Sequence, residues 1–133
     1  MTTLFALYRR PDGGDDALAT FERRYAEEHL PLIAATPELL AVRVRRVTQG
    51  LLGDRDLFLT CAMEFEDRAA VDRALASDEM RAAGRNLREI APGLTTLVIL
   101  EDDPDLDPGV DRDPGAATSP AMDTVGTTAE ERS

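Results

Sequence analysis

Four segments in the first hundred residues have the apolar content and the length of β-strands. One of them, 39–47, alternates Val42 and Val44 with Arg43 and Arg45, which is typical of a strand with one polar face. The others are apolar along most of their length, as in strands that are covered on both faces. The predicted strands are 3–9, 39–47, 57–65 and 94–101.

Helical spacing occupies the intervals between these strands. Apolar residues recur at three to four positions, or seven, through 16–35, and Asp15 or Asp16 is placed to cap that helix. Asp67 begins a second helical segment that runs to about Ala76, and Ser77 restarts it toward Arg88. The predicted order is therefore strand, helix, strand, strand, helix, strand.

This order is that of the split βαβ, or ferredoxin-like, arrangement. It predicts an α+β domain with a four-stranded antiparallel sheet and helices on one face. The uncovered face is also expected to be apolar, because strands one, three and four carry apolar residues at both odd-numbered and even-numbered positions. A bare apolar sheet of that size is unfavourable in water, so we expect a second copy to cover it in a homodimer. In strand one, Phe5 and Leu7 lie on the face opposite to Leu4 and Ala6. In strand three, Phe58 and Ala62 lie opposite to Leu57, Leu59 and Met63. In strand four, Leu97 and Ile99 lie opposite to Val98 and Leu100.

The folded domain is expected to span 1–101, and 102–133 is expected to be a disordered acidic tail rich in Pro and Gly. Of the net charge of −11, residues 101–133 carry −8, which leaves the domain nearly balanced. This distribution argues against nucleic-acid binding, which requires a basic surface. The acidic run 103–109 resembles a calcium loop weakly, but its sixth and twelfth positions are Pro108 and Pro114, so no metal is expected.

The sequence indicates a cytoplasmic protein without a membrane anchor. No stretch approaches the ~20 apolar residues of a membrane span, and the N-terminus lacks the basic region of a signal peptide. The single cysteine, Cys61, fits a reducing compartment. It could be a nucleophile paired with the histidine, although a buried strand cysteine is the more common situation.

His29 is the main candidate for chemistry, because it is the only histidine and lies four residues after Tyr25 on the apolar stripe. Pro31 is expected to break or bend the helix and to free carbonyls beside His29. The imidazole could accordingly be a buried cap that donates to such a carbonyl. Tyr25 could equally be a packing residue, or it could pair with the imidazole.

Several segments resemble the EthD family over residues 1–101. They are Leu4-Phe-Ala-Leu-Tyr8-Arg-Arg-Pro11, Phe21-Glu-Arg-Arg-Tyr25-Ala-Glu-Glu-His29-Leu-Pro-Leu32 and Ala74-Leu-Ala-Ser-Asp-Glu. The resemblance implies the dimeric α+β barrel superfamily, in which two ferredoxin-like sheets face each other. Founding members are associated with fuel-ether degradation beside a haem monooxygenase system. Relatives include polyketide cyclases, decarboxylases, cofactor-free monooxygenases and haem-binding enzymes.

The resemblance has departures. The chain has no tryptophan, and the Asn-Phe pair often seen near the end of the second helix appears as Glu89-Ile90. For a haem, His29 would be the sole histidine ligand. We therefore expect no cofactor.

The leading hypothesis is a homodimer that binds a small, largely apolar metabolite near the end of the first helix. His29 would be the general base or acid, and Tyr25 or Tyr8 would hold a substrate oxygen or orient the imidazole. The reaction would be cyclisation, dehydration or decarboxylation of an aromatic or polyketide-like compound. The alternatives are a non-catalytic accessory or binding protein of an oxidative degradation pathway and a cofactor-free monooxygenase. Three arginines, Arg43, Arg45 and Arg46, could bind an anion or simply form a solvated sheet edge.

Overall fold

The structure is a computed structural model that describes residues 1–114. The chain divides into two units, Met1–Asp102 and Asp103–Ser133, and the strands and helices found within residues 1–114 lie in the first. In the second unit, residues 103–114 are exposed and form turns around Asp103, whose carbonyl accepts from Leu106 and Asp107. The prediction of disorder falls largely on residues 115–133, outside the described part, and stays a prediction. Within residues 1–114, no helix combines the length and the apolar character needed to cross a membrane.

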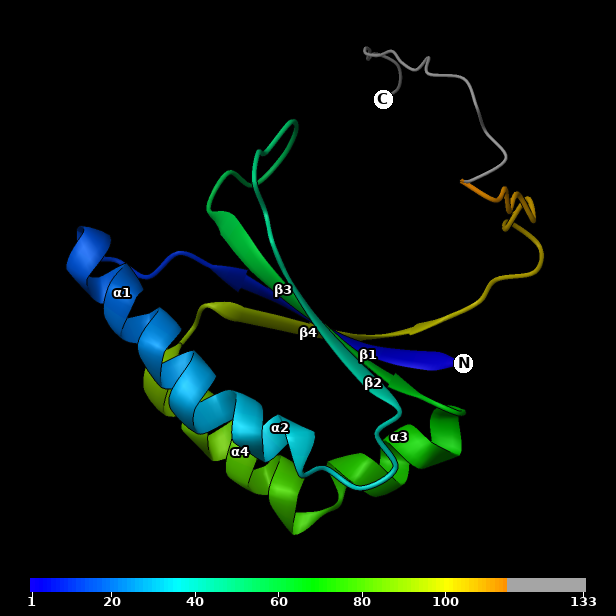
Figure 1. Ribbon diagram of the computed structural model, residues 1–133, viewed down its shortest axis with the longest axis horizontal. Helices are drawn as coiled ribbons and strands as arrows, with labels where there is room; N and C mark the ends of the chain where they lie inside the picture. Colours follow the sequence, from blue (N-terminus) through cyan, green and yellow to red (C-terminus); the bar gives the residue numbers. More distant parts are fainter. Residues whose placement is uncertain (115–133) are drawn as a thin grey trace. The chain divides into compact units, whose positions relative to one another are not determined.

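The four predicted strands form one antiparallel sheet, which confirms the ferredoxin-like α+β fold (Figure 1). Their order in the sheet is β2-β3-β1-β4, so β1 and β3 are central and β2 and β4 are edges. β2 and β3 pair as the predicted hairpin, and β1 pairs with both β3 and β4. The bounds are β1 Thr2–Arg9, β2 Ala41–Arg46, β3 Leu57–Phe65 and β4 Thr95–Glu101.

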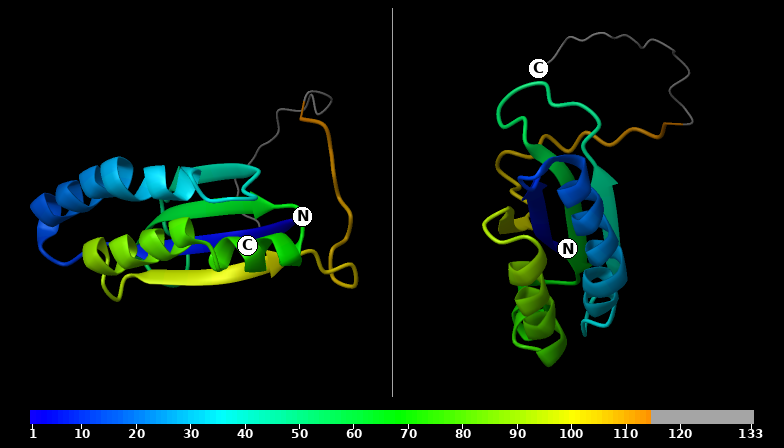
Figure 2. Two further views of the ribbon diagram at one scale, coloured as in Figure 1. Left: turned by 90° about the horizontal axis from the view of Figure 1, so that it is seen from below. Right: turned by 90° about the vertical axis from the view of Figure 1, so that its left-hand side faces the viewer.

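The helices of the described part of the chain lie on one face of this sheet, as predicted (Figure 2). The second crossover holds α3, Arg68–Leu75, and α4, Asp78–Ile90. Asp67 and Ser77 cap them, each accepting a hydrogen bond from the main-chain N–H three residues later. α4 runs alongside the first helical segment, so the two crossovers form one helical layer.

The first crossover is α1, Gly14–Arg24, followed by the π-helical turn η1, Tyr25–His29, and α2, Leu30–Ala34. The expected break at Pro31 does not occur. The π turn lies just before the proline, with Leu30 donating to the carbonyl of Tyr25, and Pro31 lies in the first turn of α2. A proline is tolerated in a first helical turn, because its missing N–H is not needed there.

The start of α1 also differs from the expectation. The cap position is Gly13, in a left-handed conformation with φ of 114°, and Asp15 and Asp16 lie within the first turn. A Cβ at Gly13 would come within 2.9 Å of the Ala17 side chain, so glycine is required on both counts. The two aspartates still favour the helix through its dipole.

The two faces of the sheet differ in burial. In β1, the even-numbered residues are buried beneath the helices and the odd-numbered ones point to the open face. Phe58 departs from the predicted alternation. A bulge in β3 opposite Tyr8 and Arg9 places it in the core, 1% exposed, whereas Ala62 stays on the open face.

Candidate functional site

His29 lies at the end of the π turn, 2% exposed, between the sheet and α4. π-helical turns inside α-helices are frequent at functional sites. The imidazole is stacked on Tyr25, with ring centroids 5.2 Å apart and planes inclined by 29°. The predicted contact between Tyr25 and His29 is therefore present.

The structure brings all three predicted site residues together. The Tyr25 hydroxyl donates to the Tyr8 hydroxyl at 3.2 Å, so Tyr8 from β1 joins Tyr25 and His29 from the helix. Phe21 and Phe58 extend the same aromatic cluster. Cys61, fully buried beneath it, interacts with the Tyr25 hydroxyl.

Burial keeps this cluster neutral. It raises the pKa of the Tyr8 and Tyr25 phenols far above the ordinary value, and it raises the pKa of the Cys61 thiol. Burial also lowers the pKa of His29, against a smaller opposing effect from its hydrogen bond to Asn86. At neutral pH the site thus holds a neutral imidazole, two phenols that can donate and a thiol that is a poor nucleophile.

The partner of His29 lies on the opposite helix. Its Nδ1 lies 3.2 Å from Oδ1 of Asn86 in α4, and Nδ2 of Asn86 donates to Glu28 at 3.0 Å. Glu28 is in turn held by both nitrogens of the Arg24 guanidinium. Among residues 1–114, no main-chain carbonyl accepts from the imidazole, so the expected cap is replaced by a side-chain contact.

Asn86 was not singled out in the sequence. It is a polar residue in the interior half of an amphipathic helix, four before Ile90 and three after Ala83, both of which are buried. This position among buried residues of the helix was the sequence signal that could have identified Asn86.

A narrow cavity of about 50 Å³ lies in front of His29 and Tyr8. His29 and Tyr8 carry its polar groups, and Tyr25 supports Tyr8 from outside the lining. The other residues around it are apolar or glycine: Leu4, Ala6, Ile33, Met63, Met80, Ala83, Gly84, Leu87 and Leu97.

A wider cleft of about 270 Å³ adjoins this cavity, between α4 and the edge strand β4. The two spaces share Gly84, Leu87 and Leu97. Leu97 is 49% exposed, so this side of the site is open to solvent. Together the spaces come close to the smallest volumes usual for ligand pockets, about 300 Å³.

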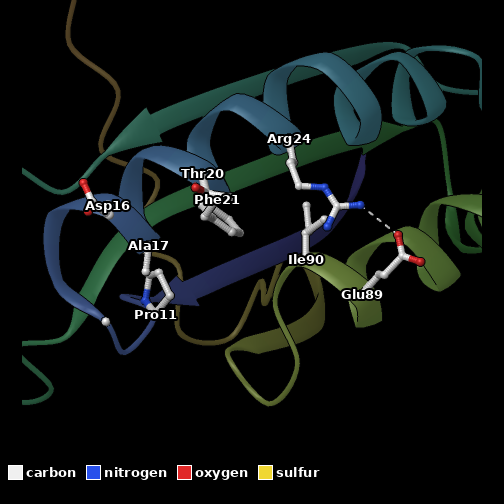
Figure 3. A pocket seen from close by; sticks show the side chains of 9 residues that line it. Pro11, Asp16, Ala17, Thr20, Phe21, Arg24, Glu89 and Ile90 are labelled. Carbon is white, nitrogen blue, oxygen red and sulfur yellow. Dashed lines mark hydrogen bonds and ion pairs between the residues drawn. The ribbon is translucent and has the colours of Figure 1, made fainter.

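Another groove, of about 520 Å³, lies between α1 and the end of α4 (Figure 3). Arg24 crosses it to Glu89 at 2.9 Å. The guanidinium is already shared by Glu28 and Glu89, and neither His29 nor Tyr8 lines the groove. The groove therefore lies between the two crossovers, away from His29 and Tyr8, and its other polar side chains are Asp16 and Thr20.

The remaining candidates lie elsewhere. Arg43 and Arg45 border a pocket of about 340 Å³ on the open face of the sheet, whereas Arg46 points to the helical side and pairs with Glu22 at 2.7 Å. Among residues 1–114, no group of three or more His, Cys, Asp and Glu side chains is arranged to hold a metal ion.

Solved structures similar to this fold include an ethyl tert-butyl ether D (EthD) family protein from Bacillus halodurans, 30% identical, with a TM-score of 0.69 over 77% of this chain and 99% of that protein. A dimeric ferredoxin-like protein of unknown function from Bacteroides fragilis is 18% identical, with a TM-score of 0.56 over 76% and 95%. An antibiotic biosynthesis monooxygenase, also 18% identical, has a TM-score of 0.53 over 78% and 100%. At this lower identity the likeness shows the fold alone. No family model and no curated protein sequence matches the chain.

Proposed function

The chain belongs to the EthD family, and on this basis we propose that it is a homodimer that binds a small, largely apolar molecule between its sheet and α4 and removes a proton from it. His29 would be the general base, and the Tyr8 hydroxyl would donate to a substrate oxygen. One observation carries the proposal: a histidine and a tyrosine are the residues with polar side chains in the lining of an otherwise apolar cavity.

The protonation states suit this chemistry. A neutral imidazole can accept a proton from carbon, and its burial keeps it neutral at pH values where an exposed histidine would begin to protonate. Because Tyr8 accepts from Tyr25, its own hydroxyl proton remains available to a ligand. A carbonyl oxygen placed at Tyr8 would gain negative charge as the adjacent C–H bond breaks, and the phenol would stabilise that charge.

The reaction class follows from these groups. The C–H proton goes to His29, the electron pair goes to the carbonyl as an enolate, and the enolate then closes a ring, loses a leaving group or is reprotonated. Cyclisation and dehydration share this first step. Decarboxylation uses the same two groups to stabilise the enolate and to return a proton to carbon.

The homodimer is supported by the open sheet face and by the dimeric ferredoxin-like relative. Val98 and Leu100 on that face are 37% and 46% exposed, alongside the half-buried Phe5 and Leu7. Covering them by sheet-on-sheet packing would remove this apolar area from water.

The test uses ortho-hydroxyacetophenone, an aromatic ketone with removable protons beside its carbonyl. The full chain in deuterium oxide should accelerate the exchange of the methyl protons, followed by proton NMR. His29→Gln should abolish the acceleration, and Tyr8→Phe should reduce it by about 10- to 100-fold if the phenol contributes one hydrogen bond to a developing charge.

Glu27→Gln is the matched control, since it removes a charge two residues from His29 on the exposed side of the helix. It should leave the exchange rate unchanged. Undiminished exchange in His29→Gln would contradict the proposal. Saturable binding of the ketone without exchange in the parent would favour the non-catalytic binding protein, and so would a tightly held compound recovered by mass spectrometry.

A further inference from the structure

We propose that Asn86 is a positioning residue that holds His29 in the tautomer with the proton on Nδ1, leaving the lone pair of Nε2 as the base. The value of this arrangement for catalysis rests on the proposed function. The tautomer itself is a property of the unliganded protein and can be measured alone.

Glu28 fixes the orientation of Asn86. Two nitrogens of Arg24, Nε and Nη2, each lie 2.9 Å from an oxygen of this carboxylate. A forked guanidinium contact of this kind stabilises the charged carboxylate, and it lowers the pKa of Glu28. Glu28 is therefore ionised at neutral pH, and an ionised carboxylate can only accept hydrogen bonds.

The orientation of the Asn86 amide follows. The group 3.0 Å from Glu28 Oε1 must be a donor, which assigns it as Nδ2. Turning the amide over would set its oxygen against the carboxylate, leaving two acceptors in contact and the NH₂ group facing the imidazole. The oxygen Oδ1 is consequently the atom that faces His29.

The amide orientation in turn determines the tautomer of His29. Oδ1 of Asn86 lies 3.2 Å from Nδ1, and an amide oxygen can only accept, so Nδ1 must carry a proton. Because burial favours the neutral ring, Nε2 is left unprotonated. Among residues 1–114, Nε2 has no hydrogen-bond partner. The one side-chain polar atom in this range that is both fully buried and without a partner is Thr95 Oγ1. Nε2 must therefore retain some accessible surface.

The arrangement is anchored at both helices. Arg24 also binds Glu89, which lies three residues after Asn86 and therefore near it on the same side of α4. The series Glu89, Arg24, Glu28, Asn86 and His29 thus passes from α4 to the first crossover, back to α4 and again to the first crossover. It couples the direction of the imidazole to the spacing of the two helices.

The decisive measurement is the tautomer of His29 in the full-length protein, from proton–nitrogen NMR spectra of the imidazole at neutral pH. The assignment is direct, because the chain has a single histidine. The parent should show a protonated Nδ1 and an Nε2 nitrogen shifted to the position of an unprotonated ring nitrogen. A parent in which Nε2 is protonated would overturn the proposal.

Two variants test the cause. Glu28→Gln replaces the obligate acceptor with an amide that can also donate, so the Asn86 orientation is no longer dictated and the Nε2–H form should appear. Asn86→Ala should shift the ring further toward the Nε2–H form. Glu89→Gln is the matched control, because Glu89 also pairs with Arg24 but makes no hydrogen bond to Asn86.

The expected result is a shift in the first two variants and none in the control. An unchanged tautomer in both Glu28→Gln and Asn86→Ala would overturn the proposal. The result is independent of ligand: a protein that exchanges no ketone protons but shows the Nδ1–H tautomer would contradict the proposed function and leave this inference intact.

Discussion

Both faces of the sheet carry apolar side chains, but they differ in how much of that apolar surface the chain itself buries. On the helical face, Leu4, Ala6 and Tyr8 of β1 are 1–2% exposed, because α1, α2 and α4 lie directly over them. On the open face, Phe5 and Leu7 of the same strand are only half-buried. The helices of the chain itself cover the first face, and His29 and Tyr8 lie together on that face. The other is left partly exposed in the single chain, and the proposed homodimer would cover it.

Two phenylalanines provide the strongest test of this difference. Phe58→Ala removes a ring that is 1% exposed beneath α1, and it should lower the free energy of unfolding by about 3–5 kcal/mol. Phe5→Ala on the open face should have a smaller effect on the monomer and should weaken association instead. Urea melts at two protein concentrations separate the effect on monomer folding from the effect on association, since only dimer stability depends on concentration. Equal losses in both variants, with no concentration dependence, would contradict the comparison.

A charge on the open face should break the dimer and leave the domain folded. In Val98→Asp a carboxylate would be placed in the apolar contact without a partner, and we expect the dissociation constant to rise by at least about 10-fold, or 1.4 kcal/mol. Sedimentation equilibrium measures this directly. Leu97→Asp is the control, because Leu97 points to the helical side of the same strand. A parent that is already monomeric at micromolar concentration would rule out the homodimer.

The two tyrosines of the helical face should respond differently to loss of the hydroxyl. Tyr25→Phe keeps the aromatic packing and removes the hydroxyl's hydrogen bond to Tyr8 and its interaction with Cys61. It should cost at least about 0.5–1.5 kcal/mol of stability and leave ketone exchange largely intact. Tyr8→Phe should reduce exchange, because Tyr8 lines the cavity. Thermal melts and exchange rates on the same preparations would reveal a reversed pattern, which would place Tyr25 rather than Tyr8 in the site.

The buried imidazole should make the helical face sensitive to acid. Because burial holds the pKa of His29 below its unfolded value of about 6.5, the unfolded chain takes up the proton first. The contribution of His29 to stability is therefore full above about pH 6.5 and falls as the pH decreases below it. His29→Gln should show a flatter dependence in this range. Chemical denaturation of both proteins between pH 5 and pH 8 (roughly the range that brackets this pKa) measures the difference, and parallel curves would mean that the pKa is not lowered.

The element order could be read from the sequence because each strand and helix is specified locally. Asp67 and Ser77 lie at the starts of their helices in both the prediction and the structure. Local patterns do not report a change of register. The bulge that turns Phe58 inward arises from the pairing of β3 with β1, and neither strand shows it alone.

The site was predictable only in part, for a related reason. His29, Tyr25 and Tyr8 stood out by rarity and by spacing, and the structure brings them into contact; their roles remain proposals. Asn86 did not stand out, because its importance comes from lying opposite His29 across a helix pair separated by 57 positions in the sequence. The helix continues through Pro31 because a π turn precedes it and the proline then lies in the first turn of α2, where its missing N–H is not needed.

The π turn also makes the number of residues in the first crossover a constraint in its own right. The buried positions Phe21, Tyr25, His29 and Ile33 are spaced by four, and each such step overshoots a regular helical turn by about 40°. Over three steps a uniform α-helix would drift by about 120°, enough to rotate one end of the row away from the sheet. A local turn that takes up an extra residue offsets part of this drift. A one-residue deletion between Phe21 and Ile33 would therefore change which side chains face the site, whereas the same deletion at 48–53, in the loop between β2 and β3, would leave those side chains in place.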